Sequence, residues 1–182
     1  TAPTVIHDIL ITKDNHYWLA YRYANSGNVI VEVYDSNGVL YNSPLNGKIY
    51  YGLSSPYFLN SYKLLQASDT SFYTCINFGK TINWALNQYS GGVQFYHYNT
   101  KGELIRTFGK NGMITHELCN KLSSGWDLFM QDNAGRIVFA NNLQDSIIDG
   151  LRGYPIAIYN SSLYRFQTNG LLDSTFNDSG IF

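Results

Sequence analysis

The side chains best suited to metal or acid–base chemistry are the histidines, of which the chain has four: His7, His16, His97 and His116. A zinc site gathers His and Cys ligands at short spacings, such as two histidines on one face of a helix. No two of these histidines are separated by two or four residues. The sequence therefore predicts no metal centre, and it offers no motif for a bound cofactor.

Two aspartate-rich segments, residues 35–38 and 132–135, look like the beginning of a calcium-binding loop. Such a loop places oxygen ligands at about six spaced positions and ends in a bidentate carboxylate. Neither segment is followed by that closing glutamate. We therefore interpret both segments as hairpin turns.

A nucleophilic serine of a hydrolase commonly lies in a Gly-x-Ser-x-Gly turn, and a phosphate site commonly has a glycine-rich loop before a helix. The sequence contains neither pattern. We assign no catalytic residue. A hydrolase with residues scattered over the repeats is the least favoured function.

Aromatic residues make up 16% of the chain, including 16 Tyr, 10 Phe and 3 Trp. Charged residues make up 14% and the net charge is −1, so the basic footprint of a nucleic-acid-binding protein is missing. Aromatic side chains concentrate at protein interfaces and in ligand-binding sites. The composition favours a protein partner or a glycan, and it argues against nucleic acid.

No apolar run approaches the roughly 18 residues that cross a bilayer, so we expect no membrane span. The chain begins at Thr1 without Met, which fits a mature secreted chain or an excised segment, and we expect a secreted or cell-surface location. The two cysteines, Cys75 and Cys119, are too few for a disulfide framework. They are either two buried thiols or one disulfide.

The elements that position these residues repeat along the chain. The closing segment, Tyr164 to Phe182, has an earlier copy from Tyr96 to Ile114 and a shorter one from Glu32 to Ile49. Their turn glycines, Gly38, Gly102 and Gly170, lie 64 and 68 residues apart. A repeat of this length sets the architecture, because each copy is one structural unit.

Each copy contains short runs of apolar and aromatic residues between turn residues, which indicates strands. We predict four strands in the first copy, at residues 5–11, 16–23, 29–34 and 39–42. The second copy is expected to have strands at 61–66, 72–78, 93–98 and from Glu103 onward. In the third, we expect strands at 126–131 and 136–140, followed by an insertion with weak helical spacing at 143–152. Residues 155–159 are extended, either as part of the third strand or as an extra ribbon, and residues 164–166 lead into the final turn.

The third copy resembles the delta-60 repeat of bacterial proteins, which pairs a short hairpin with an ending that contains Arg, Gly, Leu, Asp, Phe and Gly at fixed spacings. The matching residues are Arg165, Gly170, Leu172, Asp173, Phe176 and Gly180. The second copy matches at Gly102, Leu104, Phe108, Gly109 and Gly112, with His97 in place of the Arg. The resemblance implies β-propeller blades, and it implies no particular activity.

We therefore expect an all-β chain of three four-stranded antiparallel propeller-type blades, a half-propeller. Residues 1–182 form a single repeat domain with units at about 5–50, 58–115 and 121–182. Phe108 and Phe176 are expected to be packing anchors between blades. The alternative fold is a β-trefoil, which also has three units and twelve strands.

The expected function is that of a non-catalytic binding or scaffold module of a bacterial secreted or surface protein, acting through protein–protein interaction. A lectin-like carbohydrate-binding module is the alternative. Because propellers have about 4–8 blades, three do not close a ring. We expect a homodimer that completes one propeller, or a longer chain that supplies the other blades. The uncovered faces are expected to expose apolar residues such as Val29, Val31, Val33, Leu128 and Met130.

Overall fold

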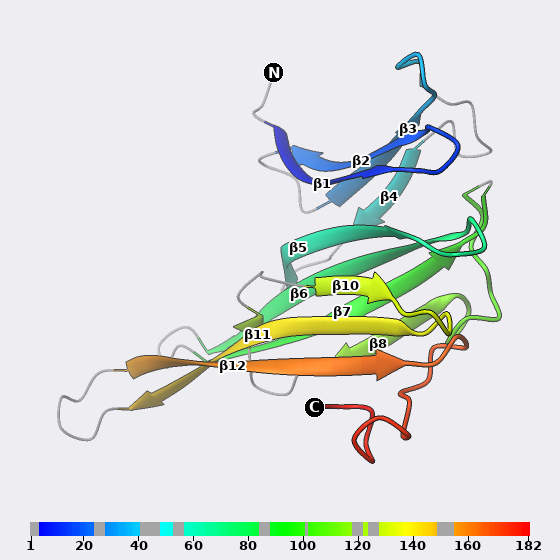
Figure 1. Cartoon of the computed structure of the whole chain (residues 1–182). Coiled ribbons are helices and arrows are strands. Elements are labelled where there is room, and N and C mark those ends of the chain that lie inside the picture. The colour runs from blue at the N-terminus through cyan, green and yellow to red at the C-terminus, as the bar shows by residue number, and fades with distance from the viewer. Residues whose placement is uncertain are drawn as a thin grey trace.

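The computed structural model describes residues 4–23, 28–40, 48–52, 57–83, 88–100, 102–117, 122–123, 128–148 and 155–182. All regular elements among these residues are β-strands, arranged in three antiparallel sheets (Figure 1). The prediction of an all-β chain is confirmed.

Each sheet is continuous in sequence. The first has the order β1 (Thr4–Ile11), β2 (Tyr17–Tyr23), β3 (Asn28–Tyr34), β4 (Lys48–Gly52). The second has the order β5 (Tyr57–Gln66), β6 (Phe72–Asn83), β7 (Gln88–Tyr98), β8 (Met113–Glu117). The third contains β9 (Leu122–Ser123), β10 (Leu128–Gln131), β11 (Ile137–Ile148) and β12 (Pro155–Phe166). Because β9 and β10 both pair with β11 and β11 also pairs with β12, the third sheet is only three strands wide.

Tight turns join the strands at one end of each sheet. The turn between the first two strands has a residue with positive φ in each repeat: Asn15 (59°), Thr70 (70°) and Gly135 (79°). The later turn has its glycine in the same region, at Gly38 (76°), Gly102 (80°) and Gly170 (89°). Glycine adopts this conformation without strain, so the repeated glycines are explained and the predicted hairpin turns are confirmed.

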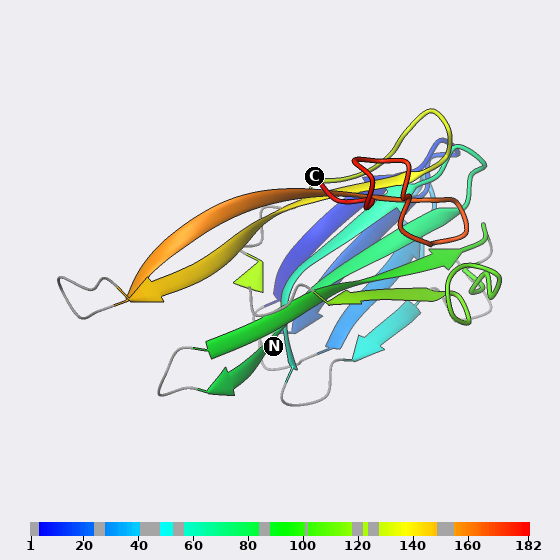
Figure 2. The same ribbon diagram turned by 90° about the horizontal axis from the view of Figure 1, so that it is seen from below.

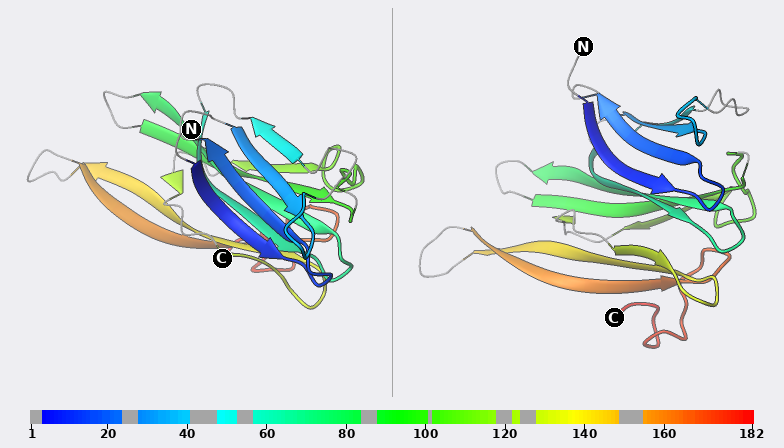
Figure 3. Two further views of the ribbon diagram at one scale, coloured as in Figure 1. Left: turned by 90° about the horizontal axis from the view of Figure 1, so that it is seen from above. Right: turned by 45° about the horizontal axis from the view of Figure 1, so that its top comes forward.

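The three sheets stack face to face as layers, with the second in the middle (Figure 3). Alternate residues of a strand point to opposite faces, and β6 uses both. Phe72 and Ile76 enter a core shared with the first sheet. Tyr73 and Cys75 enter a second core shared with the third sheet. The middle sheet is therefore apolar on both faces, and this holds the stack together.

The stack runs in one direction. We call the side of each sheet that carries Trp18, Tyr73 or Val138 its forward face, and the opposite side its rear face. These three residues occupy one register position, because their partners Val33, His97 and Arg165 each lie one residue before the end of β3, β7 or β12. The forward face of the first sheet packs on the rear face of the second, and the forward face of the second packs on the rear face of the third.

The fourth strands predicted for the first two copies are wrong. Leu40 and Leu104 make only isolated bridges to Tyr34 and Tyr98, and residues 41 and 42 lie outside the described part of the chain. The true edge strands, β4 and β8, begin several residues later. In the second repeat the reason is a further turn, in which Gly112 N donates to Phe108 O over 2.8 Å before β8 begins.

The weakly helical insertion predicted at residues 143–152 is also wrong. β11 continues to Ile148 and pairs with β12 as far as Pro155, while residues 149–152 lie outside the described part. This hairpin projects from the stack (Figure 2). The antiparallel ladder pairs the backbone of residues 143–148, and this outweighs a weak local helical spacing.

The described strands form ladders only within their own sheets, and the sheets are not closed. A β-trefoil would join its strands in one closed barrel, so this alternative does not describe the fold. The open stack exposes 10439 Å², whereas a compact monomer of 20.6 kDa would expose about 8,900 Å².

Candidate functional site

Among the residues that the structure describes, no further sheet packs on two faces at the ends of the stack: the rear face of the first sheet and the forward face of the third. In the middle sheet, which has a neighbour on each side, the side chains of both faces are buried in hydrophobic cores. We therefore take these two end faces as the candidate site.

The rear face of the first sheet exposes large apolar side chains along β1 and β2. Ile9 is 57% exposed and Ile11 is 62% exposed. The residue in the register position of Ile9 is Leu64 in the second sheet, where a neighbouring sheet buries it to 7% exposure. Ile9 thus has the side chain of a core position but lacks the sheet that would cover it.

A buried carboxylate lies on the same rear face. Glu32 in β3 is only 7% exposed, and the Tyr34 hydroxyl donates to its Oε2 over 2.6 Å. Burial, followed by the hydrogen bond and charge of Glu32, raises the pKa of Tyr21. Tyr21 is therefore protonated at neutral pH, and the Tyr34 hydroxyl holds the carboxylate against the sheet.

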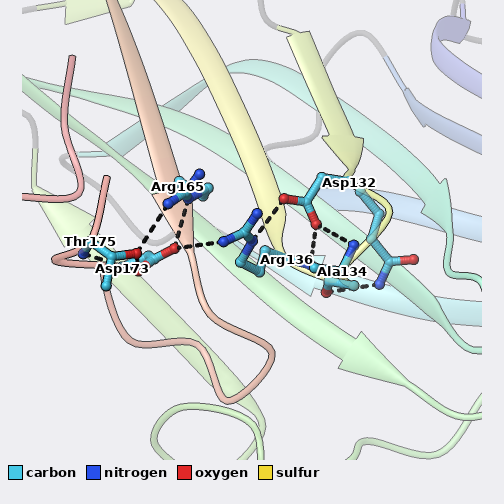
Figure 4. Close-up of polar contacts among 8 residues, drawn as sticks. Asp132, Ala134, Arg136, Arg165, Asp173 and Thr175 are labelled. Carbon is cyan, nitrogen blue, oxygen red and sulfur yellow. Dashed lines mark hydrogen bonds and ion pairs between the residues drawn. The ribbon is translucent and has the colours of Figure 1, made fainter. Parts of the chain in front are cut away.

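The forward face of the third sheet carries a network of two arginines and two aspartates, drawn in Figure 4. Arg165 Nε donates to Asp173 Oδ2 over 2.7 Å, and Arg136 Nη1 reaches the same oxygen at 3.4 Å. Arg136 Nε also donates to Asp132 Oδ2 over 2.8 Å. Two cations therefore share one nearly buried carboxylate, and the network fixes both guanidinium groups at the turn end of the sheet.

The hydroxyl of Thr175 donates to Asp173 Oδ1 over 2.6 Å. This bond, together with the Thr175 amide and Arg165, holds the pKa of Asp173 below its usual range. Arg165 also lies over the ring of Phe176, with 4.6 Å between Cζ and the ring centroid. Asp173 is therefore ionised at neutral pH. The guanidinium of Arg165 contacts both this carboxylate and the ring of Phe176.

The expectation that Phe108 and Phe176 are equivalent packing anchors holds for Phe108 alone. Phe108 is 1% exposed and lies in the core between the second and third sheets. Phe176 is only half-buried and belongs to neither core. The physical reason is position: Phe108 has the third sheet over it, whereas Phe176 lies on an end face.

The expected end-face residues are correct in part. Leu128 and Met130 in β10 are exposed, at 52% and 42%. Val29, Val31 and Val33 are buried in the first core, so that assignment was wrong. These valines belong to the forward face of their sheet, and the uncovered face is the rear one.

The middle sheet contains a Ser–His–Asp cluster that sequence inspection missed. Ser71 Oγ lies 2.7 Å from His97 Nε2 and donates to Asp69 Oδ1. In a catalytic triad the histidine lies between the serine and the carboxylate, whereas here the serine is central. Both Ser71 and His97 are buried, with His97 stacked on Tyr73. We interpret the cluster as a packed structural network.

Three of the four histidines contact different neighbours. His97 stacks on Tyr73, His116 packs edge-on against Tyr164, and His16 Nδ1 lies 2.9 Å from Asp14. Burial lowers the pKa of His97, His116 and His7, with Arg22 and Lys63 adding to the effect at His7. The described residues contain no group of three or more potential metal ligands. Cys75 is buried in the second core, and Cys119 lies outside the described residues.

Two glutamines that the sequence analysis did not single out connect consecutive sheets. Lys13 N donates to Gln66 Oε1 over 2.9 Å, and Ser68 N donates to Gln131 Oε1 over 2.8 Å. The sequence signal was available, because each glutamine ends the first strand of its repeat. In the first repeat, Ile11 occupies the position of these glutamines.

Comparison with protein-family models, with curated protein sequences and with solved structures finds no match for this chain. Within the described residues there is also no helix of the length and hydropathy that a membrane crossing requires.

Proposed function

We propose that the chain is a non-catalytic binding and scaffold module built from propeller-type blades, and that it binds protein through its two end faces. The delta-60 resemblance supports the blade interpretation and a bacterial secreted or surface setting. One observation carries the proposal: the end faces expose apolar side chains at positions that are core positions elsewhere in the same stack.

The chemistry of the end faces favours a protein over a sugar. Large exposed apolar patches are typical of protein interaction sites. On the rear face, the exposed Tyr17 and Tyr23 lie beside the isoleucines of β1. A sugar site would instead combine an aromatic shelf with several polar groups that bind hydroxyls. The fixed Arg136 and Arg165 on the other face add polar specificity at its rim.

The test compares the wild-type chain with the variants Ile9→Lys and Met130→Lys. Each variant places a charge on one end face at a position already exposed, so the fold is expected to survive. The immobilised proteins are probed with a glycan array and with an extracellular protein fraction of the source organism. We expect the wild type to bind protein, whether a different chain or a further copy of itself, and we expect a loss of this binding in at least one variant. Glycan binding that both variants retain would contradict the proposal.

A further inference from the structure

We infer that the protein partner of the end faces is a second copy of this chain, bound head to tail. The forward face of the third sheet of one copy packs on the rear face of the first sheet of the other. Two copies joined by two such contacts close a ring of six sheets. This inference rests on the proposed binding function and names its partner.

The contact between copies continues an interface that the chain already makes twice. In both internal interfaces, a forward face packs on a rear face. The two uncovered faces are one forward face and one rear face, so they form the same type of pair. Two forward faces, or two rear faces, would have no precedent within the molecule.

The second internal interface has a feature that the end faces can reproduce. Beside Phe108, Gly109 N donates to Asn169 O in the turn of the next repeat over 2.9 Å. One repeat later the corresponding residues are Phe176 and Asn177, both on the open face. The first sheet of a second copy presents the corresponding turn, with Asn37 before Gly38. The half-buried Phe176 would then be covered as Phe108 is.

The apolar residues of the two faces are complementary in position. The forward face offers Met130, and its counterpart in the middle sheet, Leu65, packs into the second core. The rear face offers Ile9, whose counterpart Leu64 is buried in the first core. Ile11 stands where the second and third sheets have a bridging glutamine. The contact between copies is therefore apolar at that position. The backbone amide of Asn133, which corresponds to the Lys13 and Ser68 amides that donate to these glutamines, then stays in solvent at the rim.

The symmetry of head-to-tail contacts is compatible with an assembly of two copies. Head-to-tail contacts form a closed ring when the rotation closes, and propeller rings contain about 4–8 blades. Six sheets lie within this range. Standard interfaces bury about 800 Å² per partner, so two contacts would bury about 1,600 Å² of each chain.

Size exclusion with light scattering at micromolar concentration tests the inference. We expect the wild type at twice the chain mass of 20.6 kDa. Ile9→Lys disables the rear face and Met130→Lys disables the forward face, so each variant alone is expected to be monomeric. A mixture of the two variants is expected to regain association, because one intact forward face meets one intact rear face.

Leu171→Lys is the matched control, since Leu171 is exposed but its counterpart Glu103 stays exposed even in the covered middle sheet. It is expected to keep the wild-type mass. All variants must keep the wild-type melting temperature. A monomeric wild type, larger open assemblies, or a dimer lost in only one face variant would each overturn the ring. A monomer that still captures another protein through these faces would refute this inference and leave the proposed function intact.

Discussion

Phe108 and Phe176 occupy the same position in successive repeats, yet Phe108 is 1% exposed and Phe176 is only half-buried. Phe108 packs against Tyr73, with 5.5 Å between the ring centroids. Phe176 instead packs on the guanidinium of Arg165. The same side chain thus has two environments, and the difference is whether a sheet follows in the stack.

Phe108→Ala is expected to lower the free energy of unfolding by about 3–5 kcal/mol, because it leaves a cavity between two sheets. Phe176→Ala is expected to cost about 1 kcal/mol, because a partly exposed cation–π contact is weak. Urea unfolding measures both, in the Ile9→Lys background so that association of chains does not contribute. Equal costs for the two variants would show that Phe176 is covered within a single chain.

Gly170→Ala is expected to destabilise more than Gly102→Ala. Both glycines have positive φ, so alanine strains the backbone at each by about 1 kcal/mol. A Cβ at Gly102 would meet nothing within 4 Å, whereas one at Gly170 would lie 2.5 Å from Ile114 Cδ1. This overlap is expected to add about 1–3 kcal/mol.

The variant Ile114→Val supplies the check on that extra cost. It removes Cδ1 but keeps Cγ1, which would lie 2.7 Å from the new Cβ, so Gly170→Ala should cost less in its presence but should keep part of the overlap cost. Thermal unfolding of the double-mutant cycle measures the coupling between the two sites. Additive costs would show that the turn moves away from β8 without penalty.

Much of the fold could be predicted from the sequence because its signals are local. Asn169 and Gly170 between apolar runs predict a hairpin, and the spacing of such turns predicts repeated antiparallel units. The edge strand of the second sheet was misplaced because β8 pairs only after an additional turn between Phe108 and Gly112. The extension of β11 was missed because pairing with β12, and not local propensity, decides that segment.

The candidate site was less predictable, because it depends on which face of a sheet is covered. Val31 and Ile9 both belong to alternating apolar strands, and the sequence does not say that the valine faces a neighbour while the isoleucine faces solvent. The pairing of Arg136 with Asp173 joins residues 37 positions apart. Such contacts follow from the register of β11 and β12, which becomes known only with the structure.

Gln131→Ala is expected to cost about 1 kcal/mol, because the side chain accepts from Ser68 N and donates from Nε2 to Gly135 O over 3.0 Å. The clearest readout is amide hydrogen exchange at Ser68, which should become faster. Gln131→Glu keeps the acceptor oxygen and is expected to keep Ser68 protected. Faster exchange in both variants would mean that the carbonyl oxygen is not what protects Ser68.

The last prediction concerns pH and the buried His97. Burial lowers its pKa, opposed by the charge of Asp69. The unfolded chain therefore binds a proton at a higher pH than the folded chain does. Stability from this site is complete above the unfolded pKa of about 6.5, and it is lost as the pH falls through the folded value. We expect the free energy of unfolding to decrease on acidification, starting below about pH 6.5.

The aspartates give a second loss at lower pH. The pKa of Asp173 and that of Asp69 are both lowered, chiefly by hydrogen bonds from Thr175 and Ser71. Their stabilisation is present above the unfolded value of about 3.9 and disappears as the pH falls through the folded values. Urea unfolding from about pH 7.5 to about pH 3 should therefore show two successive decreases. His97→Gln should flatten the first decrease, although His116 and His7 leave part of it. The second decrease should change only in the part due to Asp69, because the charge of His97 helps to lower the pKa of that carboxyl. An unaltered first decrease in this variant would show that His97 does not contribute to it.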